Sequence, residues 1–378
     1  MSEMSYLEKL LDGVEVEWVT LGSMADIGTG SSNRQDESEN GIYPFYVRSK
    51  NILKSDTFEF DEVAIVIPGE GGIGDIFHYV EGKYALHQRA YRIRITTNAV
   101  DTKFLYYFMS SSFKQYILTK SVGATAISIR KPMLEGFKVP IPSPDNPEKS
   151  LAIQSEIVRI LDKFTALTAE LTAELTMRKN QYNYYRDQLL SFKEGEVEWK
   201  TLGEVAVIGT GNHDTQDAIE HGKYIFYARG REPLKLNVFD FDETAIITAG
   251  DGAGVGKVFH YAKGKYALHQ RAYRIVPNAF MNPRFVYHYI TAYFFTYIQK
   301  ASVSSSVTSL RRPMFLKFPI PVPPSEEQAR IVEILDKFDT LTNSITEGLP
   351  REIELRQKQY EYYRDLLFSF PRPETASN

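Results

Sequence analysis

Short apolar and alternating runs predict strands in both halves of this chain. One run covers residues 61–67 and another covers residues 242–248, and each leads into a glycine-rich turn. A period of two is typical of a strand with one buried face. Apolar positions with helical spacing follow in both halves, at residues 104–117 and 285–298. We therefore expect a mixed α/β domain, here called a head, in each half.

A second helical pattern follows each head, with the alternating steps of three and four residues that are typical of a coiled-coil seam. The seam positions are Ile157, Ile160, Phe164, Leu167 and Leu171, then Ile331, Ile334, Phe338, Leu341 and Ile345. We expect two long helices, with Ser150 and Ser325 as N-caps. Gly-Leu-Pro at residues 348–350 predicts a kink or break in the second helix. Proline clusters at residues 140–144 and 319–324 predict short, extended, rigid necks between heads and helices.

The halves repeat one another in sequence. Residues 16–22 return at residues 197–203 with one change, and residues 83–93 return unchanged at residues 265–275. Two copies of a head followed by a helix predict internal pseudo-two-fold symmetry. Duplex DNA is itself two-fold symmetric and is a natural partner for such a molecule.

Two further repeats concern the ends of the elements. Residues 10–18 resemble residues 189–199, so we expect the two ends of the chain to meet beside the second helix and complete one repeat. Tyrosine-rich segments at residues 181–187 and 359–365 indicate either the far end of the helical pair or a docking surface.

The composition is that of a folded protein, with 43% hydrophobic and 13% aromatic residues among 378, enough for two or three domains. The sequence has no apolar stretch of about 18 residues and no signal pattern, so we expect it in the cytoplasm. The absence of cysteine excludes disulfides, thiolate zinc sites and a cysteine nucleophile.

The charge is distributed unevenly. The net charge is −4, yet residues 200–322 carry 15 basic and 9 acidic residues, and residues 19–140 carry 14 and 13. Acidic charge is therefore concentrated outside the heads, as expected if only the heads approach phosphates. Solvated helix faces are the alternative explanation.

Catalytic and cofactor motifs are absent from the sequence. Residues 69–74 fit Gly-x-Gly-x-x-Gly, but the next residues predict a strand rather than the helix of a dinucleotide site. Residues 252–258 lack the Ser/Thr and the glycine spacing of a phosphate loop. For both glycine-rich segments we therefore favour a hairpin between strands. The alternative is that their backbone amides lie close to a DNA phosphate. His87 and His269 have no second ligand at metal-binding spacing. The sequence predicts a protein that reads a ligand without catalysis of its own.

The repeated His-Gln-Arg-Ala-Tyr-Arg segment is the first candidate for DNA reading. As a strand it would place His87, Arg89 and Tyr91 on one face and Gln88, Ala90 and Arg92 on the other. Arginine can address guanine and glutamine adenine in the major groove, although a framework salt bridge explains any single arginine equally well. Arginine and lysine before proline, after a Ser/Thr-rich turn, are the candidates for phosphate contacts. The candidate DNA-contacting residues are Asn33, Arg34, Arg48, Lys50, Gln88, Arg89, Arg130, Lys131, His213, Arg229, Arg231, Gln270, Arg271, Arg311 and Arg312.

The order head, neck, helix, repeated twice, resembles the DNA-specificity subunits of type I restriction–modification enzymes. Two tandem Thr-Ala-Glu-Leu units, from Thr168 to Leu171 and from Thr172 to Leu175, point to the group whose spacer is set by that repeat. The resemblance implies an α+β fold in which two target-recognition domains are separated by two long helices, packed as an antiparallel coiled coil with pseudo-two-fold symmetry.

The resemblance also implies domain boundaries and partners. The expected parts are an N-terminal conserved segment (1–17), a first target-recognition domain (18–146), a central conserved helix (147–194), a second target-recognition domain (195–324) and a C-terminal conserved helix and tail (325–378). Expected partners are double-stranded DNA, two modification subunits that methylate adenine, and restriction subunits. S-adenosylmethionine, ATP and Mg are expected on those partners, and no cofactor or metal on this chain. The main alternative is a twin-headed protein-interaction scaffold that does not bind DNA, and an enzyme in its own right is a third.

Overall fold

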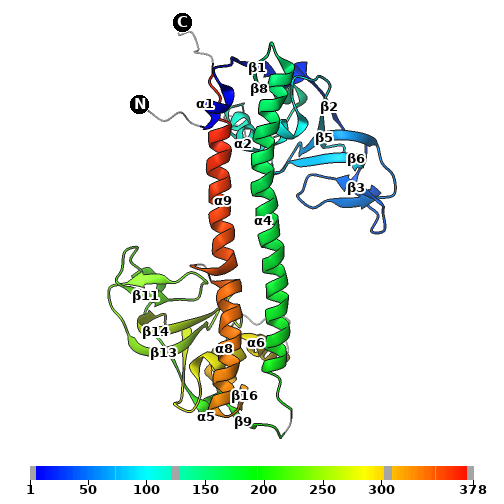
Figure 1. The fold of residues 1–378 in the computed structure, drawn as a ribbon. Helices are drawn as coiled ribbons and strands as arrows, with labels where there is room; N and C mark the ends of the chain where they lie inside the picture. The colour runs from blue at the N-terminus through cyan, green and yellow to red at the C-terminus, as the bar shows by residue number, and fades with distance from the viewer. Residues whose placement is uncertain are drawn as a thin grey trace. The chain divides into compact units, whose positions relative to one another are not determined.

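The computed structural model describes residues 6–72, 74–120, 128–193, 195–301, 309–344 and 346–372. The chain forms two compact units, one of residues 1–171 with 353–378 and the other of residues 172–352. The chain passes from one unit to the other inside the long helix α4 (Pro147–Leu189), between the two Thr-Ala-Glu-Leu units, and returns inside α9 (Gly348–Leu367), between residues 352 and 353. Figure 1 shows both helices.

The first head is built on a six-stranded sheet with the order β2-β7-β5-β6-β3-β4. Its strands are β2 (Ala25–Thr29), β3 (Tyr43–Tyr46), β4 (Leu53–Ser55), β5 (Phe60–Pro68), β6 (His78–Leu86) and β7 (Ala90–Ile95). All neighbours are antiparallel except β3 and β6, which are parallel. The remaining elements are α1 (Tyr6–Leu11), η1 (Leu21–Ser23), η2 (Arg34–Asp36), α2 (Thr102–Lys120), α3 (Lys131–Glu135), and β1 (Val16–Thr20) paired with β8 (Lys138–Pro142).

The second head repeats this architecture strand for strand, with the sheet order β10-β15-β13-β14-β11-β12. Its strands are β10 (Ala206–Thr210), β11 (Tyr224–Tyr227), β12 (Leu234–Leu236), β13 (Phe241–Ala249), β14 (Phe259–Leu268) and β15 (Ala272–Pro277). The remaining elements are α5 (Leu202–Val205), η3 (Thr215–Asp217), α6 (Pro283–Ala301), α7 (Arg312–Leu316), and β9 (Glu198–Thr201) paired with β16 (Pro319–Val322). The predicted duplication is confirmed, as are the strands at residues 61–67 and 242–248, the helices at residues 104–117 and 285–298, and the α+β class.

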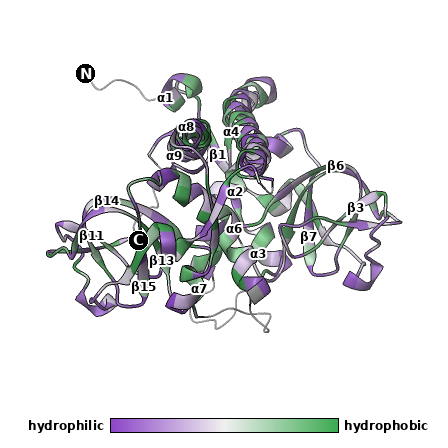
Figure 2. Ribbon diagram, turned by 90° about the horizontal axis from the view of Figure 1, so that it is seen from below, coloured by the Kyte–Doolittle hydropathy of each residue, from purple (hydrophilic) through white to green (hydrophobic). Residues whose placement is uncertain are grey.

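Each core forms where the apolar run of one strand meets a helix of the same head. Residues 64–68 of β5 are buried, and Ile65 and Ile67 pack in one cluster with Phe104 and Phe113 of α2. In the second head Ile246 packs with Phe285 and Phe294 of α6 in the same way. Figure 2 shows hydropathy along these elements and the many hydrophilic residues (purple) of the long helices. None of the helices described is long and apolar enough to cross a bilayer.

The long helices pair antiparallel inside each unit. In the first unit Phe164 stacks on Tyr363 of α9 (Gly348–Leu367), with ring centroids 5.4 Å apart, and the earlier Ile157 shares a core with the later Phe368. In the second unit Tyr185 stacks on Phe338 of α8 (Ser325–Asn343) at 5.6 Å. The antiparallel pairing that the resemblance implied is therefore present in both.

The seam itself differs in detail from the predicted one. Ile157 is buried as predicted, but the fully buried residues beside it are Ile153 and Leu161, which recur every four positions on one face, whereas Ile160 is only partly buried against the same core. Leu167 is exposed at 36%. The helix thus uses one face for its own head and another for the partner helix.

Several helix and neck predictions need correction. α4 begins at Pro147, so Ser150 is not its N-cap; the buried Ser150 hydroxyl instead accepts a hydrogen bond from Gln154 at 3.0 Å. Pro147 suits this position because proline has no backbone N–H, and an N–H in the first turn of a helix has no partner within the helix anyway. Ser325 is the first helical residue of α8 rather than its N-cap.

Residues 140–142 and 319–322 of the proline clusters are extended as predicted, but they are strands of two-stranded sheets rather than free necks. Proline is tolerated there because both strands of such a sheet are edge strands. The first cluster then bends at Ser143, whose φ is 51°, so its last two residues are not extended. The predicted break in the second helix is present between Asn343 and Gly348, and Gly348 opens α9 with a positive φ of 77°. Seam residue Ile345 lies outside the described residues, as do Ile73 of the first glycine-rich segment and Glu194 at a predicted domain boundary.

The two ends of the chain meet as predicted. Leu7 and Leu11 of α1 lie in the same core cluster as Leu367 and Phe370. The Trp18 indole N–H donates to the Pro371 carbonyl at 2.8 Å. These contacts complete one repeat of the first unit from both ends of the sequence, whereas the exact domain boundaries stay predictions.

Candidate nucleic-acid interface

The repeated His-Gln-Arg segment is a tight turn and not a strand. β6 ends at Leu86 and β7 begins at Ala90, so the predicted alternation of faces is wrong. The turn forms because the backbone N–H of Arg89 donates to His87 Nδ1 at 3.0 Å and that of Ala90 donates to the His87 carbonyl at 2.9 Å. His269 makes the same contact with the Arg271 N–H at 2.9 Å.

The histidine of each turn is a framework residue. His87 and His269 are buried, and burial lowers the pKa of both imidazoles, which the neighbouring arginines lower further. A neutral ring keeps Nδ1 as an acceptor for the turn. Across the described ranges no three His, Cys, Asp or Glu side chains form a group that could hold a metal ion.

A glycine lets the neighbouring loop approach this turn. A side chain at Gly30 would collide with the Leu86 carbonyl, and one at Gly211 would collide with that of Leu268. The loop after Gly30 then runs along the turn, where Ser32 forms a β-bridge with His87. Gln88 donates from Nε2 to the Asn33 side-chain carbonyl, and in the second head Gln270 donates to Asp214 at 3.1 Å.

In each head one carboxylate lies between two candidate arginines. Arg48 and Arg89 each donate from Nη1 to Glu70 Oε2 at 3.1 Å. In the second head the Asp251 carboxylate accepts from Arg229 at 2.9 Å and from Arg271 at 3.2 Å. Burial opposes ionisation of Asp251, but these two arginines outweigh it and hold its pKa below the usual value. The same three groups therefore meet in both heads.

The carboxylates were missed by the sequence reasoning. Glu70 follows β5 and Asp251 follows β13, each beside the glycines of a segment for which the sequence predicts a hairpin, or backbone amides near a DNA phosphate, but no role for the acidic side chain. The sequence signal was available, since Glu70 and Asp251 occupy equivalent places in the repeat.

The candidate phosphate-contacting residues lie beside this cluster. Glu70 forms a β-bridge with Ser128, and the Ile129 N–H donates to the Gly69 carbonyl at 2.9 Å, so Arg130 follows directly. In the second head the Leu310 N–H donates to the Gly250 carbonyl at 2.7 Å, which brings Arg311 and Arg312 to the same place. Arg130, Lys131, Arg311 and Arg312 are exposed. Within the described ranges the three arginines have no hydrogen-bonding or ion-pair partner, and Lys131 Nζ lies 3.9 Å from Glu135.

A pocket lies at the cluster in each head. The first, of about 340 Å³, is lined by residues that include Arg34, Arg48, Glu70 and His87. The second, of about 550 Å³, is lined by residues that include Thr215, Arg229, Arg231 and Asp251. The divergent turns at residues 123–125 and 304–306, which precede the phosphate candidates, lie outside the described residues.

The remaining candidates are placed less favourably. Lys50 is exposed but does not line the pocket. The His213 ring is held within its head, 3.6 Å from Asp217 of the same loop and 3.0 Å from Asp240 of the connection between β12 and β13. Arg92 of β7 is the framework residue that we kept as an alternative, because it pairs with Asp26 at 2.7 Å and with Glu62 at 3.0 Å.

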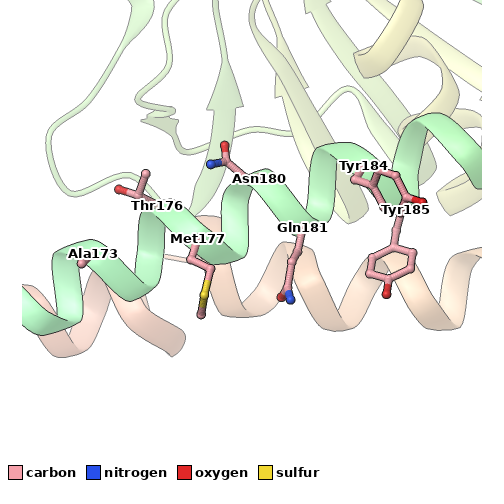
Figure 3. Close-up of a pocket in the computed structure, with 7 residues that line it drawn as sticks. All are labelled: Ala173, Thr176, Met177, Asn180, Gln181, Tyr184 and Tyr185. Carbon is pink, nitrogen blue, oxygen red and sulfur yellow. The ribbon is translucent and has the colours of Figure 1, made fainter.

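The tandem repeat is helical throughout. Thr168 donates to the Phe164 carbonyl at 2.9 Å, Leu171 and Leu175 are half-buried, and Thr172 is exposed. From the second Thr-Ala-Glu-Leu unit onward, α4 presents an open, largely apolar groove lined by Ala173, Thr176, Met177, Asn180, Gln181, Tyr184 and Tyr185 (Figure 3). Tyr184 is 59% exposed and Met177 50% exposed.

Comparison with known proteins identifies relatives along the whole chain. A model of the type I restriction modification DNA specificity domain matches twice, at residues 13–177 and 194–355. The chain is 41% identical to the type I restriction enzyme EcoR124I/EcoR124II specificity subunit of Escherichia coli, over 100% of both chains. It is 37% identical to the EcoprrI specificity subunit of the same organism, over 92% of this chain and 93% of that one.

Solved structures share the fold at lower identity. The type I restriction–modification S subunit from M. genitalium aligns with a TM-score of 0.68 at 18% identity, over 96% of this chain and 98% of that one. A chain from a study of complex assembly and conformational transition of the type I R-M system aligns with a TM-score of 0.51 at 15% identity, over 93% and 97%. By its double family match and its full-length relatives, this chain belongs to the DNA-specificity subunits of type I restriction–modification systems, which are not the catalytic subunits.

Proposed function

We propose that each head reads one half-site of a bipartite DNA target through the surface formed by its arginine–carboxylate cluster and the neighbouring phosphate candidates. The observation that carries this proposal is the recurrence of the same groups in both heads. Arg48, Glu70 and Arg89 meet in the first head, and Arg229, Asp251 and Arg271 meet in the second. Because the clusters match, we expect the two half-sites to be similar.

The partners follow from the family. The chain is proposed to join two modification subunits, which bind S-adenosylmethionine and methylate adenine, and restriction subunits that use ATP and Mg, in the cytoplasm. The exposed groove on α4 is available for a partner helix, since Met and Tyr are typical of interface cores (Figure 3). We expect the chain alone to transfer no methyl group to DNA, which an assay with labelled methyl donor would check.

The experiment is a salt titration of duplex binding by the chain in complex with its modification subunits. Each lost phosphate contact should reduce the slope of log K against log[salt] by about 0.9. We expect Arg130→Ala and Arg311→Ala each to weaken binding to all sequences alike and to reduce the slope by this amount.

Lys263→Ala is the matched control, since Lys263 is an exposed basic residue of β14 outside the cluster. It should leave the slope unchanged. A twin-headed scaffold would retain no duplex specifically at any salt concentration. Unchanged slopes for both arginine variants would place the DNA on another surface.

A further inference from the structure

The carboxylate in each cluster is unexpected on a surface that approaches DNA. Glu70 is 41% exposed at its side chain, and a carboxylate beside phosphates is repelled by them. A carboxylate at this position can therefore favour DNA binding only by accepting a hydrogen bond from a donor group. In the major groove the donors on base edges are the amino groups of cytosine and adenine.

The arginines beside it keep most of their donors free. Arg48 and Arg89 each use only Nη1 to donate to Glu70. Their Nη2 and Nε atoms form no hydrogen bond within the described part of the chain. Two adjacent guanidinium donors match the O6 and N7 acceptors of guanine. Both arginines are about half exposed, so these edges are accessible.

The carboxylate also keeps acceptor capacity. Both arginine contacts of Glu70 end on Oε2, and Oε1 has no hydrogen-bond partner among the described residues. Asp251 divides its contacts between Oδ1 and Oδ2, and a carboxylate has about four acceptor sites, so it too can accept another donor.

We propose that Glu70 and Asp251 are specificity-determining residues that read one G·C base pair in each half-site, Glu70 together with Arg89 and Asp251 together with Arg271. The arginine donates to guanine O6 and N7, and the carboxylate accepts from the cytosine amino group of the same pair. An A·T pair in its place is rejected twice, because the adenine amino group meets the arginine and thymine O4 meets the carboxylate. This inference rests on the function proposed above and names what the same surface reads.

The test removes the charge of each carboxylate by replacing it with the amide of the same shape. Glu70→Gln adds donors where only an acceptor fits, so we expect discrimination at one G·C pair of the first half-site to fall on the order of 10-fold. Asp251→Asn should relax one pair of the second half-site only. The readout is the set of methylated motifs in a bacterial genome that carries the variant with its modification subunits and no restriction subunit.

Two further variants make the outcome decisive. Glu81→Gln changes an exposed carboxylate of β6 that makes no contact with the arginines, and it should leave the motif unchanged. Arg89→Gln should relax the same base pair as Glu70→Gln, and thermal unfolding of every variant shows whether it folds.

The results separate the inference from the proposed function. If Glu70→Gln folds and weakens binding to all sequences alike with an unaltered motif, the carboxylate only orients the arginines and the inference is wrong. The same holds if Arg89→Gln and Glu70→Gln relax different base pairs. If the Arg130 and Glu70 variants all leave DNA binding unchanged, the proposed surface itself is wrong.

Discussion

At the residue scale, a single glycine, Gly30, determines whether the loop that follows it can approach the His-Gln-Arg turn. Gly30 and Gly28 belong to the same Ile-Gly-Thr-Gly segment, yet only Gly30 lies against backbone, since the nearest atom to a side chain at Gly28 would be Arg92 Nε at 3.9 Å. The repeat alone could not distinguish the two, because both glycines recur in the second head. The difference depends on a carbonyl that is 56 residues away in the chain, which no local pattern specifies.

We therefore expect Gly30→Ala to destabilise the protein by about 3 kcal/mol, because the added methyl must displace the Leu86 backbone. Gly28→Ala is the matched control and should change stability by less than about 1 kcal/mol. Denaturant unfolding of both variants is the measurement. Equal losses would mean that the loop relaxes around the methyl group.

The residue scale also shows where the sequence was insufficient at the site. Arg48, Arg89 and Arg130 could be selected from residue type alone, because phosphates and guanine both favour arginine. Glu70 could not, since its role depends on the meeting of three loops. Because candidate DNA-contacting residues are selected mainly by positive charge, an acidic residue such as Glu70 is not selected.

At the element scale, the turn between β6 and β7 depends on a neutral histidine. His87 and His269 have lowered folded-state pKa values, because of burial first and arginine charge second. The unfolded chain then binds more protons as the pH falls, so their stabilising contribution is present above the unfolded value of about 6.5 and is lost as the pH falls through the folded value. Protonation also removes Nδ1 as the acceptor for the turn.

We expect the melting temperature to fall between pH 7.5 and pH 5.5, and to fall less in the double variant His87→Asn with His269→Asn. Asparagine places an acceptor near the position of Nδ1 and does not titrate. Some fall should remain, because His78 and His260 also have lowered pKa values caused mainly by burial. An identical pH dependence in the double variant would show that the two turns do not control it.

Elements with strong periodicity were predictable, and those shaped by distant neighbours were not. The runs that became β5 and α2 bury their apolar residues as the pattern required. The His-Gln-Arg segment was misassigned because alternation of large polar residues resembles a strand, whereas here His87 turns inward to hold the backbone of Arg89.

At the scale of the whole molecule, α4 and α9 each run continuously across a boundary of the two units, whereas the return path of the chain is interrupted earlier, between Asn343 and Gly348, inside the second unit. In α4 the boundary falls between Leu171 and Thr172, inside the tandem repeat. A change of length there alters the connection without touching either head, while the interruption between α8 and α9 can take up the difference.

Insertion of a third Thr-Ala-Glu-Leu unit should therefore change spacing and not base preference. Four helical residues add about 6 Å, which corresponds to one or two base pairs at about 3.4 Å each, so the gap between the half-sites should grow by that amount. They also add about 40° beyond a full turn, which the joints between heads and helices must absorb. Sequencing of methylated motifs measures the gap and the half-sites together.

Four flexible residues, Gly-Ser-Gly-Ser, inserted at the same position are the control. They should broaden the range of accepted gaps, because a flexible linker sets no fixed length. Altered half-site bases at the original gap would show that α4 does not set the spacing.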